Sequence, residues 1–390
     1  MSSHMEEGRL VLPLTGHIDS ANATGAEAEL MKERENTPHE GLTLDLEKLD
    51  YISSAGLRVI LRLKKLEPEL KLVNVSAEVY EVFSMTGFTE MMPVEKAFRK
   101  LTVDGCEPIG RGANGTVYRI DKDTVVKVYH NNDSLPDVQR ERELARKAFV
   151  LGIPTAIPYD VVKVGESYGS VFELLNSKSF SKLIQANPEK LDEYVGIYVD
   201  IMRKLHSTEV KPGEVPSMKQ IALGWEDYIR RGLSEPYADK LMRLLGEIPE
   251  RNTLLHGDYH TNNIVVQNDE VLIIDMDTLC VGHPVFELAF MWLAFVGFGE
   301  LEERMSADFF KLSGAVTSLL WRKALCRYLE GEDEAFVDSV EEKAMVIGYA
   351  RLMRRTLKRG GLETEFGRAT IDHCRERLYE LLDKLDSLWF

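Results

Sequence analysis

Residues 256–275 read His-Gly-Asp-Tyr-His-Thr-Asn-Asn-Ile-Val-Val-Gln-Asn-Asp-Glu-Val-Leu-Ile-Ile-Asp, and they are the most specific signal in the chain. Two short apolar runs, 264–266 and 271–274, are separated by the turn-forming pair Asn268 and Asp269, which is typical of two strands joined by a tight turn. Acid and amide side chains lie just before the first run and just after the second. A turn or a cap explains each of them alone, but their order together predicts a metal and phosphate site at the tip of a loop.

The polar side chains of this stretch match the needs of phosphoryl transfer. That reaction requires a carboxylate that orients the attacking hydroxyl and accepts its proton, and oxygen ligands that hold Mg²⁺ against the β- and γ-phosphates of ATP. Asp258, Asn263 and Asp275 supply such a set. The stretch therefore indicates phosphoryl-transfer chemistry with ATP and Mg²⁺ as cofactors.

A glycine-rich segment lies upstream, between two runs that are typical of strands. Gly110, Gly112 and Gly115 would let the backbone approach a triphosphate, because no Cβ atom stands in the way. On these residues alone, a glycine-rich hairpin turn is an equally good interpretation.

Lys127 follows within Thr-Val-Val-Lys-Val-Tyr, where a strand would present its ammonium group toward the α- and β-phosphates. A lysine in so apolar a run is unusual unless it is paired or lies at an edge. The expected partner is a carboxylate on the next helix, at about residues 136–151. Glu141 is the preferred candidate and Glu143 the competing one, although a glutamate in Arg-Glu-Arg-Glu is usually solvated.

The motif at residues 256–263 resembles a known family pattern. His256, Gly257, Asp258, His260 and Asn263 fit the pattern His-Gly-Asp-x-His-x-x-Asn. Together with the glycine-rich segment and the lysine strand, they make residues 102–390 resemble the aminoglycoside phosphotransferase and choline kinase superfamily, whose members share the protein-kinase fold.

The resemblance implies roles for single residues. Asp258 would be the catalytic base, Asn263 and Asp275 would hold Mg²⁺, Lys127 would bind the phosphates, and Glu141 would hold Lys127.

Three further segments resemble parts of the same family. The strand at 168–172 with the following Glu173, Leu174 and Leu175 resembles the hinge at which backbone groups meet adenine. Residues 282–289 resemble Gly-x-Pro-x-x-Asp-Leu-Ala, with Glu287 where an aspartate is usual. His206 resembles a helix ending in Leu-His, and a satisfied histidine at a helix end explains it equally well.

Residues 9–100 alternate strand-like and helix-like patterns, which indicates a small α/β sheet. The segments 14–19 and 51–60 resemble the STAS domain of anti-sigma factor antagonists, which implies a regulatory protein partner. Ser54 occupies the place of the phosphoserine in that family, with Ser53 in place of the usual aspartate. Either serine would also serve as the N-cap of the helix that begins here, so a cap and a phosphosite both remain open.

Composition limits the classes of partner. The chain has 390 residues, 44% of them hydrophobic, and a formal net charge of −16, which disfavours nucleic acid as a partner and favours cations. The most apolar stretch, 288–298, is shorter than a membrane span, so we expect no membrane insertion. Four scattered cysteines without a Cys-x-x-Cys pair fit a reducing, cytoplasmic location.

These patterns predict an α/β STAS-like domain followed by an α+β protein-kinase-like fold with a β-rich N-lobe and a helical C-lobe. The expected boundaries are 1–8 for a disordered start that looks like a cloning remnant, 9–100 for the STAS-like domain, 101–175 for the N-lobe and hinge, and 176–390 for the C-lobe.

The expected function is ATP- and Mg²⁺-dependent phosphorylation of a small-molecule hydroxyl, with the STAS domain in a regulatory or scaffolding role. Seven acids in 330–342 could attract an aminoglycoside or choline-like cation, although such a run is more often a solvated loop and helix start. The alternative is a partner-switching signalling protein whose kinase-like domain phosphorylates protein, with Ser54 as a candidate site.

Overall fold

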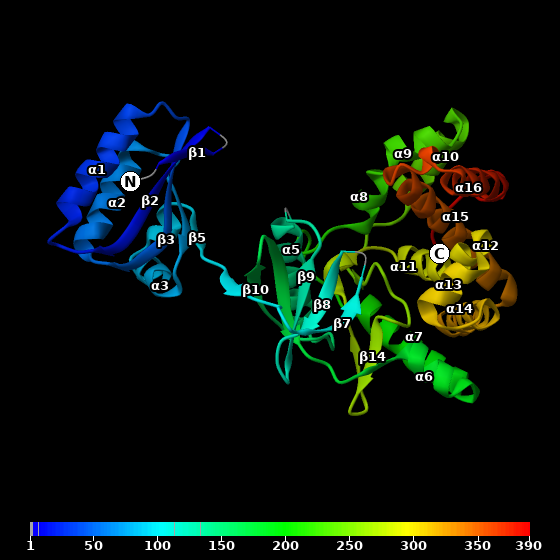
Figure 1. The fold of residues 1–390 in the computed structure, drawn as a ribbon. Coiled ribbons are helices and arrows are strands. Elements are labelled where there is room, and N and C mark those ends of the chain that lie inside the picture. The colour runs from blue at the N-terminus through cyan, green and yellow to red at the C-terminus, as the bar shows by residue number, and fades with distance from the viewer. Residues whose placement is uncertain (1–2, 7, 113, 133) are drawn as a thin grey trace. The chain divides into compact units, whose positions relative to one another are not determined.

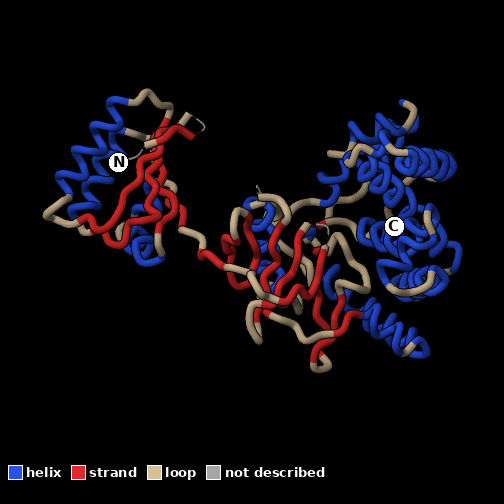
Figure 2. The backbone as a smooth tube through the Cα atoms, in the orientation of Figure 1, coloured by secondary structure: helices blue, strands red, loops and turns tan. Residues whose placement is uncertain are grey.

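The computed structural model describes residues 3–6, 8–112, 114–132 and 134–390. They divide into two compact units, Met1–Thr102 and Val103–Phe390. Strands and helices alternate in the first unit, whereas in the second the strands gather at one end and the helices at the other (Figure 2).

The first unit is an α/β domain built on one sheet with the strand order β1-β2-β3-β4-β5 (Figure 1). Strands β2 to β5 run parallel, and β1 is antiparallel to β2. The core is apolar because alternate residues of the strands are buried, as at Leu42, Leu44 and Leu46, none of which is exposed. The strands are β1 (His4–Glu6), β2 (Arg9–Ile18), β3 (Gly41–Ile52), β4 (Lys71–Val75) and β5 (Val94–Lys96), and the helices are α1 (Ala23–Asn36), α2 (Ser54–Leu66), α3 (Ala77–Met85) and α4 (Phe88–Met91).

The start of the chain differs from the prediction. Residues 1–8 were expected to be disordered, yet β1 pairs with β2, with His4 opposite Val11 and Glu6 opposite Arg9. The physical reason is that β2 would otherwise end the sheet with a row of unpaired backbone groups, and β1 pairs with part of that row.

The two serines at the start of α2 have separate positions. Ser53 is the N-cap, and its Oγ accepts hydrogen bonds from the backbone N–H groups of Ala55 (3.2 Å) and Gly56 (3.5 Å). Ser54 is the first helical residue and is exposed. The capping role therefore belongs to Ser53, and the hydroxyl of Ser54 is left at the surface.

We expect Ser53→Ala to lower the stability of α2 by about 1 kcal/mol, because two N–H groups at the helix start lose their acceptor. The matched variant Ser54→Ala should change it by less than about 0.5 kcal/mol. All four tryptophans lie beyond residue 102, so the measurement is hydrogen exchange of peptides covering α2 rather than tryptophan fluorescence. An equal effect of the two substitutions would contradict this assignment of the cap.

The second unit begins with an antiparallel sheet in which β10, β11, β9, β8 and β7 are neighbours in that order. Helix α5 packs against this sheet, and Val138, Leu144 and Ala148 face inward on it at helical spacing. These elements form the predicted β-rich N-lobe. Their bounds are β7 (Glu107–Arg111), β8 (Gly115–Arg119), β9 (Thr124–Tyr129), α5 (Leu135–Val150), β10 (Pro158–Val164) and β11 (Ser167–Glu173), and the short β6 (Arg99–Leu101) precedes them.

The remainder is the predicted helical C-lobe, so the predicted fold class is confirmed. Short strands interrupt it at β12 (Lys178–Ser179), β13 (Leu254–Leu255), β14 (Ile264–Gln267), β15 (Glu270–Ile273) and β16 (Cys280–Val281). The helices are α6 (Phe180–Ala186), α7 (Leu191–Ser207), α8 (Met218–Leu223), α9 (Glu226–Gly232), α10 (Glu235–Glu247), α11 (Val285–Trp292), α12 (Phe298–Leu301), α13 (Glu303–Phe310), α14 (Gly314–Tyr328), α15 (Glu334–Lys358) and α16 (Glu365–Lys384).

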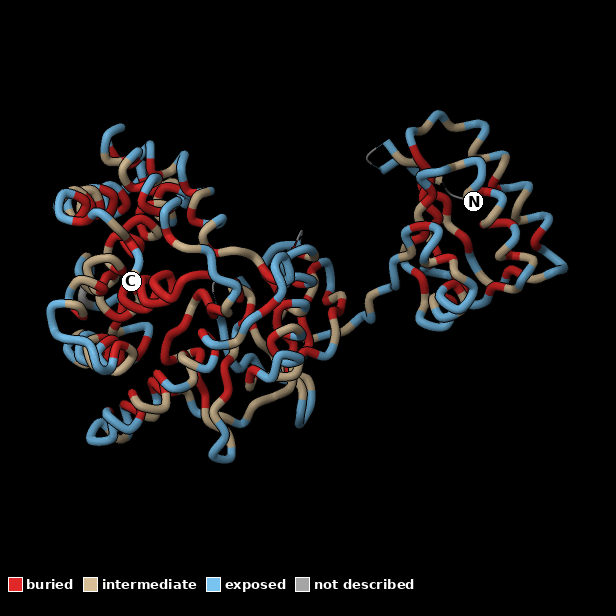
Figure 3. The backbone as a smooth tube through the Cα atoms, turned by 180° about the vertical axis from the view of Figure 1, so that it is seen from behind, coloured by how far each residue is buried: buried red, intermediate tan, exposed pale blue. Residues whose placement is uncertain are grey.

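Helix α11 lies in the centre of this lobe and is buried along its whole length (Figure 3). It contacts α15 and α14, which explains why the sequence is most apolar here. Across the part of the chain that the structure describes, no helix combines the length and the apolar character that crossing a membrane requires.

Candidate active site

Lys127 and Glu141 form a buried ion pair in the N-lobe. Strand β9 lies between β8 and β11, and it directs the Lys127 ammonium group toward α5. Lys127 Nζ lies 2.6 Å from Glu141 Oε1, and the Glu141 side chain is only 2% exposed. The competing candidate, Glu143, pairs instead with Lys147 at 3.1 Å.

The same lysine reaches the C-lobe. Lys127 Nζ donates to Asp275 Oδ1 at 2.9 Å. Burial alone would lower the pKa of Lys127, but the negative charges of Glu141, Asp275 and Asp277 raise it above its usual value. The ammonium group therefore stays charged and links the two lobes at one point.

Two of the predicted metal ligands, Asn263 and Asp275, flank the base of the β14–β15 hairpin. Ile264 pairs with Ile273, and the backbone N–H of Ile274 donates to the carbonyl of Asn263, so Asn263 lies beside the residue that precedes Asp275. Asp275 has φ 66° and ψ 61°, the left-handed region that a non-glycine residue rarely adopts. Such conformations concentrate at functional sites, because the surrounding structure must hold them.

Asp277 also belongs to this site, a position that was not predicted from the sequence. Carboxylate oxygens of Glu141, Asp275 and Asp277 lie within 4.8 Å of one another. Burial and the neighbouring charge of Asp275 raise the pKa of Asp277 to about 7, against the opposing effect of Lys127. The sequence pattern from which Asp277 could have been predicted is the Asp-x-Asp spacing at 275–277. Hard oxygen donors so close together suit Mg²⁺.

Asp258 lies in the loop between β13 and β14, and its side chain is 45% exposed, so a substrate can reach it. His260 Nε2 lies 3.5 Å from Asp258 Oδ2. Burial would raise the pKa of Asp258, but the hydrogen bond and charge of His260, with Arg351 and His256, lower it below its usual value. The carboxylate is therefore ionised at neutral pH.

Gly257 is required by the shape of this loop. It has φ 81°, and a Cβ atom there would lie 2.5 Å from the backbone carbonyl oxygen of Thr278. Arg351 Nη1 donates to the Gly257 carbonyl at 3.0 Å. The loop thus passes close to the segment after Asp275 and is held by helix α15 from the other side.

Glu287 holds the backbone of the same loop, at His256 and Gly257, through hydrogen bonds. It is fully buried on α11, and its carboxylate accepts from the backbone N–H groups of His256 (2.5 Å) and Gly257 (2.9 Å). His206 lies near, with Nε2 3.7 Å from Glu287 and Nδ1 bonded to Tyr328 Oη at 2.8 Å. The glutamate that departs from the family pattern therefore fills a definite role in positioning the loop.

We expect Glu287→Ala to destabilise the second unit by about 3 kcal/mol, because two buried N–H groups lose their acceptor and a cavity replaces the side chain. Urea denaturation followed by tryptophan fluorescence measures this unit, because it contains all four tryptophans. The control is Glu143→Ala, since Glu143 is 61% exposed. Equal midpoints for the two variants would show that Glu287 does not support the loop.

The three glycines of the glycine-rich segment are not equivalent. A Cβ atom on Gly115 would lie 2.5 Å from the Val128 carbonyl, whereas Gly110 and Gly112 have room for one. The N–H of Gly112 donates to the Gly115 carbonyl at 2.9 Å, which closes the β7–β8 turn. The segment is thus a hairpin turn, which confirms one of the two interpretations, and its approach to a triphosphate stays a prediction. Ala113 lies outside the described residues.

At the predicted hinge, β11 ends at Glu173. The N–H of Glu173 donates to the Ile157 carbonyl and that of Leu174 to the Asp123 carbonyl, which ties the segment to the N-lobe. Leu175 follows and is half-buried. Contact of Glu173 and Leu175 with adenine stays a prediction.

The acidic run 330–342 is largely engaged in ion pairs and capping. Asp333 caps α15 through the N–H of Phe336. The carboxylates of Glu334, Asp338 and Glu341 all lie within 4.0 Å of Arg322, and Glu330 pairs with Arg327. These acids are therefore engaged with basic groups of the same chain.

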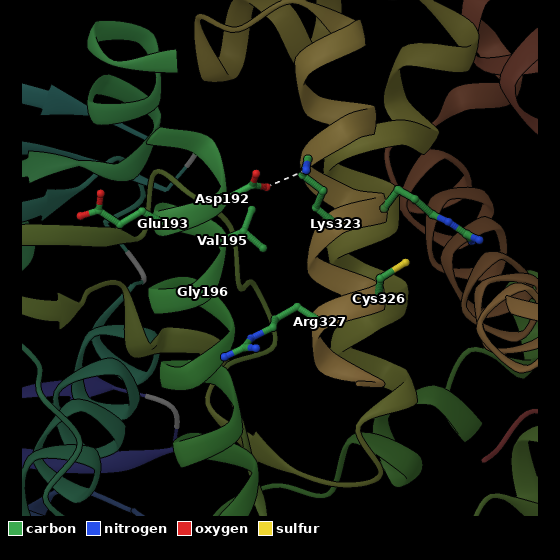
Figure 4. A pocket seen from close by; sticks show the side chains of 8 residues that line it. Asp192, Glu193, Val195, Gly196, Lys323, Cys326 and Arg327 are labelled. Atoms are coloured by element: carbon green, nitrogen blue, oxygen red, sulfur yellow. Dashed lines mark hydrogen bonds and ion pairs between the residues drawn. The ribbon is translucent and has the colours of Figure 1, made fainter. Parts of the chain in front are cut away.

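Among the cavities that described residues line in the second unit, two bear on where a ligand binds. One, of about 440 Å³, lies between α7 and α14, where Lys323 pairs with Asp192 at 2.6 Å (Figure 4). It contains none of the predicted site residues. The other, of about 700 Å³, reaches Gly257 and Asp277 and extends between the two lobes. This second cavity adjoins the candidate active site.

A β-rich lobe with a buried lysine–glutamate pair, joined to a helical lobe whose acidic side chains meet that lysine, defines the class of kinase-like phosphotransferases. The chain belongs to the phosphotransferase enzyme family, whose profile matches residues 105–325. The second unit is thus an enzyme domain, and the predicted resemblance is confirmed.

The first unit is a STAS domain, whose profile matches residues 3–101. It is 42% identical, over 92 residues, to BtrV of Bordetella bronchiseptica, a protein named as an anti-sigma factor antagonist. The match covers 23% of this chain and 78% of that protein. The second predicted resemblance is confirmed as well.

Three solved structures are similar to this chain at low sequence identity. A thermostable mutant of aminoglycoside phosphotransferase APH(4)-Ia is 14% identical, with 71% of this chain and 94% of that chain covered and a TM-score of 0.49. The streptomycin and ATP complex of APH(2″)-IIa is 14% identical, with 78% and 98% covered and a TM-score of 0.48. A choline/ethanolamine kinase family protein from Mesorhizobium loti is 16% identical, with 72% and 88% covered and a TM-score of 0.45.

Proposed function

We propose that the second unit transfers the γ-phosphate of ATP to a hydroxyl group of a small molecule. The observation that carries this proposal is the contact of Lys127 with both Glu141 and Asp275, because it brings a phosphate-binding cation and metal-binding acids of the two lobes to one point. Lys127 would bind the α- and β-phosphates, with Glu141 holding it in place. Gly110, Gly112 and Gly115 would cover the phosphates, and the backbone of Glu173 and Leu175 would meet the adenine.

The donor set fits Mg²⁺. Asp275 and Asn263 would hold the ion, with Asp277 as a third oxygen donor, because carboxylate and amide oxygens are the ligands that this hard cation prefers. When bound, Mg²⁺ would neutralise charge that develops on the transferring phosphate.

Asp258 would act on the acceptor. The acceptor oxygen forms a bond to the γ-phosphorus while the bond from that phosphorus to the bridging oxygen of ADP breaks, and the hydroxyl proton passes to Asp258. Since the pKa of Asp258 is lowered, the carboxylate is ionised and ready to orient the hydroxyl, and it takes the proton only as the new bond forms.

A labelling experiment tests the proposal. The protein is incubated with Mg²⁺ and ATP labelled in the γ-position, together with a filtered small-molecule extract of cells, and the label is then located. Transfer into the small-molecule fraction by wild-type protein, but not by Asp258→Asn, supports the proposal. Label in the protein alone supports the alternative in which the second unit phosphorylates protein. If no label is transferred at all, both the small-molecule proposal and this alternative are contradicted.

We propose in addition a regulatory role for the STAS domain, with Ser54 as its phosphosite. The supporting observation is that Ser53 occupies the cap, while Ser54 is exposed and its hydroxyl makes no hydrogen bond to any described residue. A phosphate there would be favoured by the helix dipole and would add nearly two negative charges to the surface that meets a partner. Mass spectrometry of the same labelled sample locates any phosphate on Ser54.

A further inference from the structure

The cleft of about 700 Å³ beside the candidate active site has a lining most of which the phosphotransfer machinery does not use. Tyr129 lines it from the N-lobe, Gly257 from the catalytic loop, and Trp225 and Phe290 from the C-lobe. Its size is that of a typical site for a small molecule, and its aromatic walls suit one. The cleft is therefore the natural place for the acceptor.

Its charged lining is mainly basic. Arg351, Arg354 and Lys358 lie on one face of α15, at the spacing i, i+3 and i+7, and all three line the cleft. Arg140 lines it from α5. The carboxylates that line it are Asp137 and Asp277, so four cations share the cleft with two acids.

The charge of Arg351 acts on Asp258, but the four cations form no close ion pair with a described residue. Among the described residues, none of the four forms an ion pair, although the chain carries 64 acidic residues against 48 basic ones. Arg354 Nε is buried without a hydrogen-bond partner in the same set. Arg351 and Arg354 are half-buried, whereas Arg140 and Lys358 are exposed. Cationic groups that are partly withdrawn from water are normally paired, because desolvating them is costly. In so acidic a chain, unpaired cations gathered in one cleft point to an anionic ligand.

The basic face also adjoins the reacting groups. Arg351 donates to the carbonyl of Gly257, the residue before the candidate base, and its guanidinium lies 3.5 Å from the centroid of the Phe290 ring. One end of the row is thus placed against the catalytic loop, and Arg354 and Lys358 continue it along α15. An acceptor that is bound by this row would bring its hydroxyl close to Asp258.

We infer that this cleft binds the acceptor, and that the acceptor is a small molecule whose hydroxyl lies close to an anionic group, a phosphate or a carboxylate. This inference rests on the proposed phosphotransfer function. Guanidinium groups bind both kinds of anion through paired N–H donors, and this class of acceptor is the opposite of the cationic one that the acidic run 330–342 suggested.

The test is a titration with inorganic phosphate at constant ionic strength, followed by the thermal stability of the full chain. It compares Arg354→Gln/Lys358→Gln with the control Arg355→Gln/Arg359→Gln, which removes the same charge from neighbouring positions that do not line the cleft. We expect phosphate to bind the wild type and the control alike and the cleft variant about tenfold more weakly. The titration is done with and without saturating Mg-ADP.

Three outcomes overturn the inference: equal phosphate binding by the two double variants, loss of Mg-ADP binding rather than phosphate binding in the cleft variant, or binding of the polycation kanamycin in the cleft at the expense of phosphate. The proposed phosphotransfer fails separately, if Mg-ADP does not bind the wild type. In that case the titration without nucleotide still tests the cleft, because it compares phosphate binding by the cleft variant with phosphate binding by the control variant.

Discussion

Asp258→Asn is expected to lower kcat for the accepted hydroxyl compound by about 10²–10⁴-fold, the range typical of a lost general base. The amide keeps the shape of the side chain but cannot accept the proton of the attacking hydroxyl. Lys127, Glu141 and Asp275 hold one another independently of Asp258, so the nucleotide site should survive. The variant should therefore gain the same thermal stability from Mg-ATP as the wild type.

Two measurements separate this outcome from simple damage to the fold. The first is single-turnover transfer from labelled ATP, which isolates the chemical step, and the second is the melting temperature with and without Mg-ATP. A suitable control is Asp269→Asn, an acid-to-amide change at an exposed turn of the same lobe. Turnover by Asp258→Asn within a few-fold of the wild type would exclude Asp258 as the base.

Asp275→Asn is expected to weaken Mg²⁺-dependent ATP binding by at least about tenfold, because a hard cation loses a charged oxygen ligand. The substitution also removes the charge that pairs with Lys127 at 2.9 Å. Asparagine is chosen because it tolerates the left-handed backbone at φ 66° nearly as well as aspartate, whereas alanine would add strain.

The hairpin offers a matched control for this prediction. Asp269 also has a left-handed backbone, at φ 63°, and it lies at the far end of the β14–β15 hairpin from Asp275. Asp269→Asn should leave the Mg²⁺ dependence unchanged, as measured by titrating Mg²⁺ at fixed ATP. If the two variants respond alike, Asp275 is not a metal ligand.

Much of the fold was readable because its signals are local. The alternation at 42–46 and the helical spacing at 57–63 depend on neighbours a few residues away, and the structure forms β3 and α2 there. The edge strand at His4–Glu6 was missed, because its pairing is set by the need to cover β2 and not by its own composition.

The candidate site was predicted only in part. Glu141 and Glu143 differ by two positions, which on a helix places them about 200° apart, so only one can face Lys127. The sequence could not settle which of the two faces the sheet, since that depends on how α5 packs. Asp277 was not predicted for a different reason. An aspartate is common in turns, so its sequence position gave no signal, and only the fold places it beside Asp275, where the pKa of its carboxyl is raised.

The sequence alone was enough to predict the family, the domain order and the chemical groups of the site. The reason is that motifs such as 256–263 lie within short loops and hairpins, where residues that are close in sequence are also close in space. Which of those groups come into contact depends on the tertiary fold. Lys127 meets Asp275 across 148 positions and Arg351 meets Gly257 across 94. Contacts between such distant residues depend on the packing of whole helices and sheets, so the basic face of α15 became a feature of the active-site cleft only when the chain was folded.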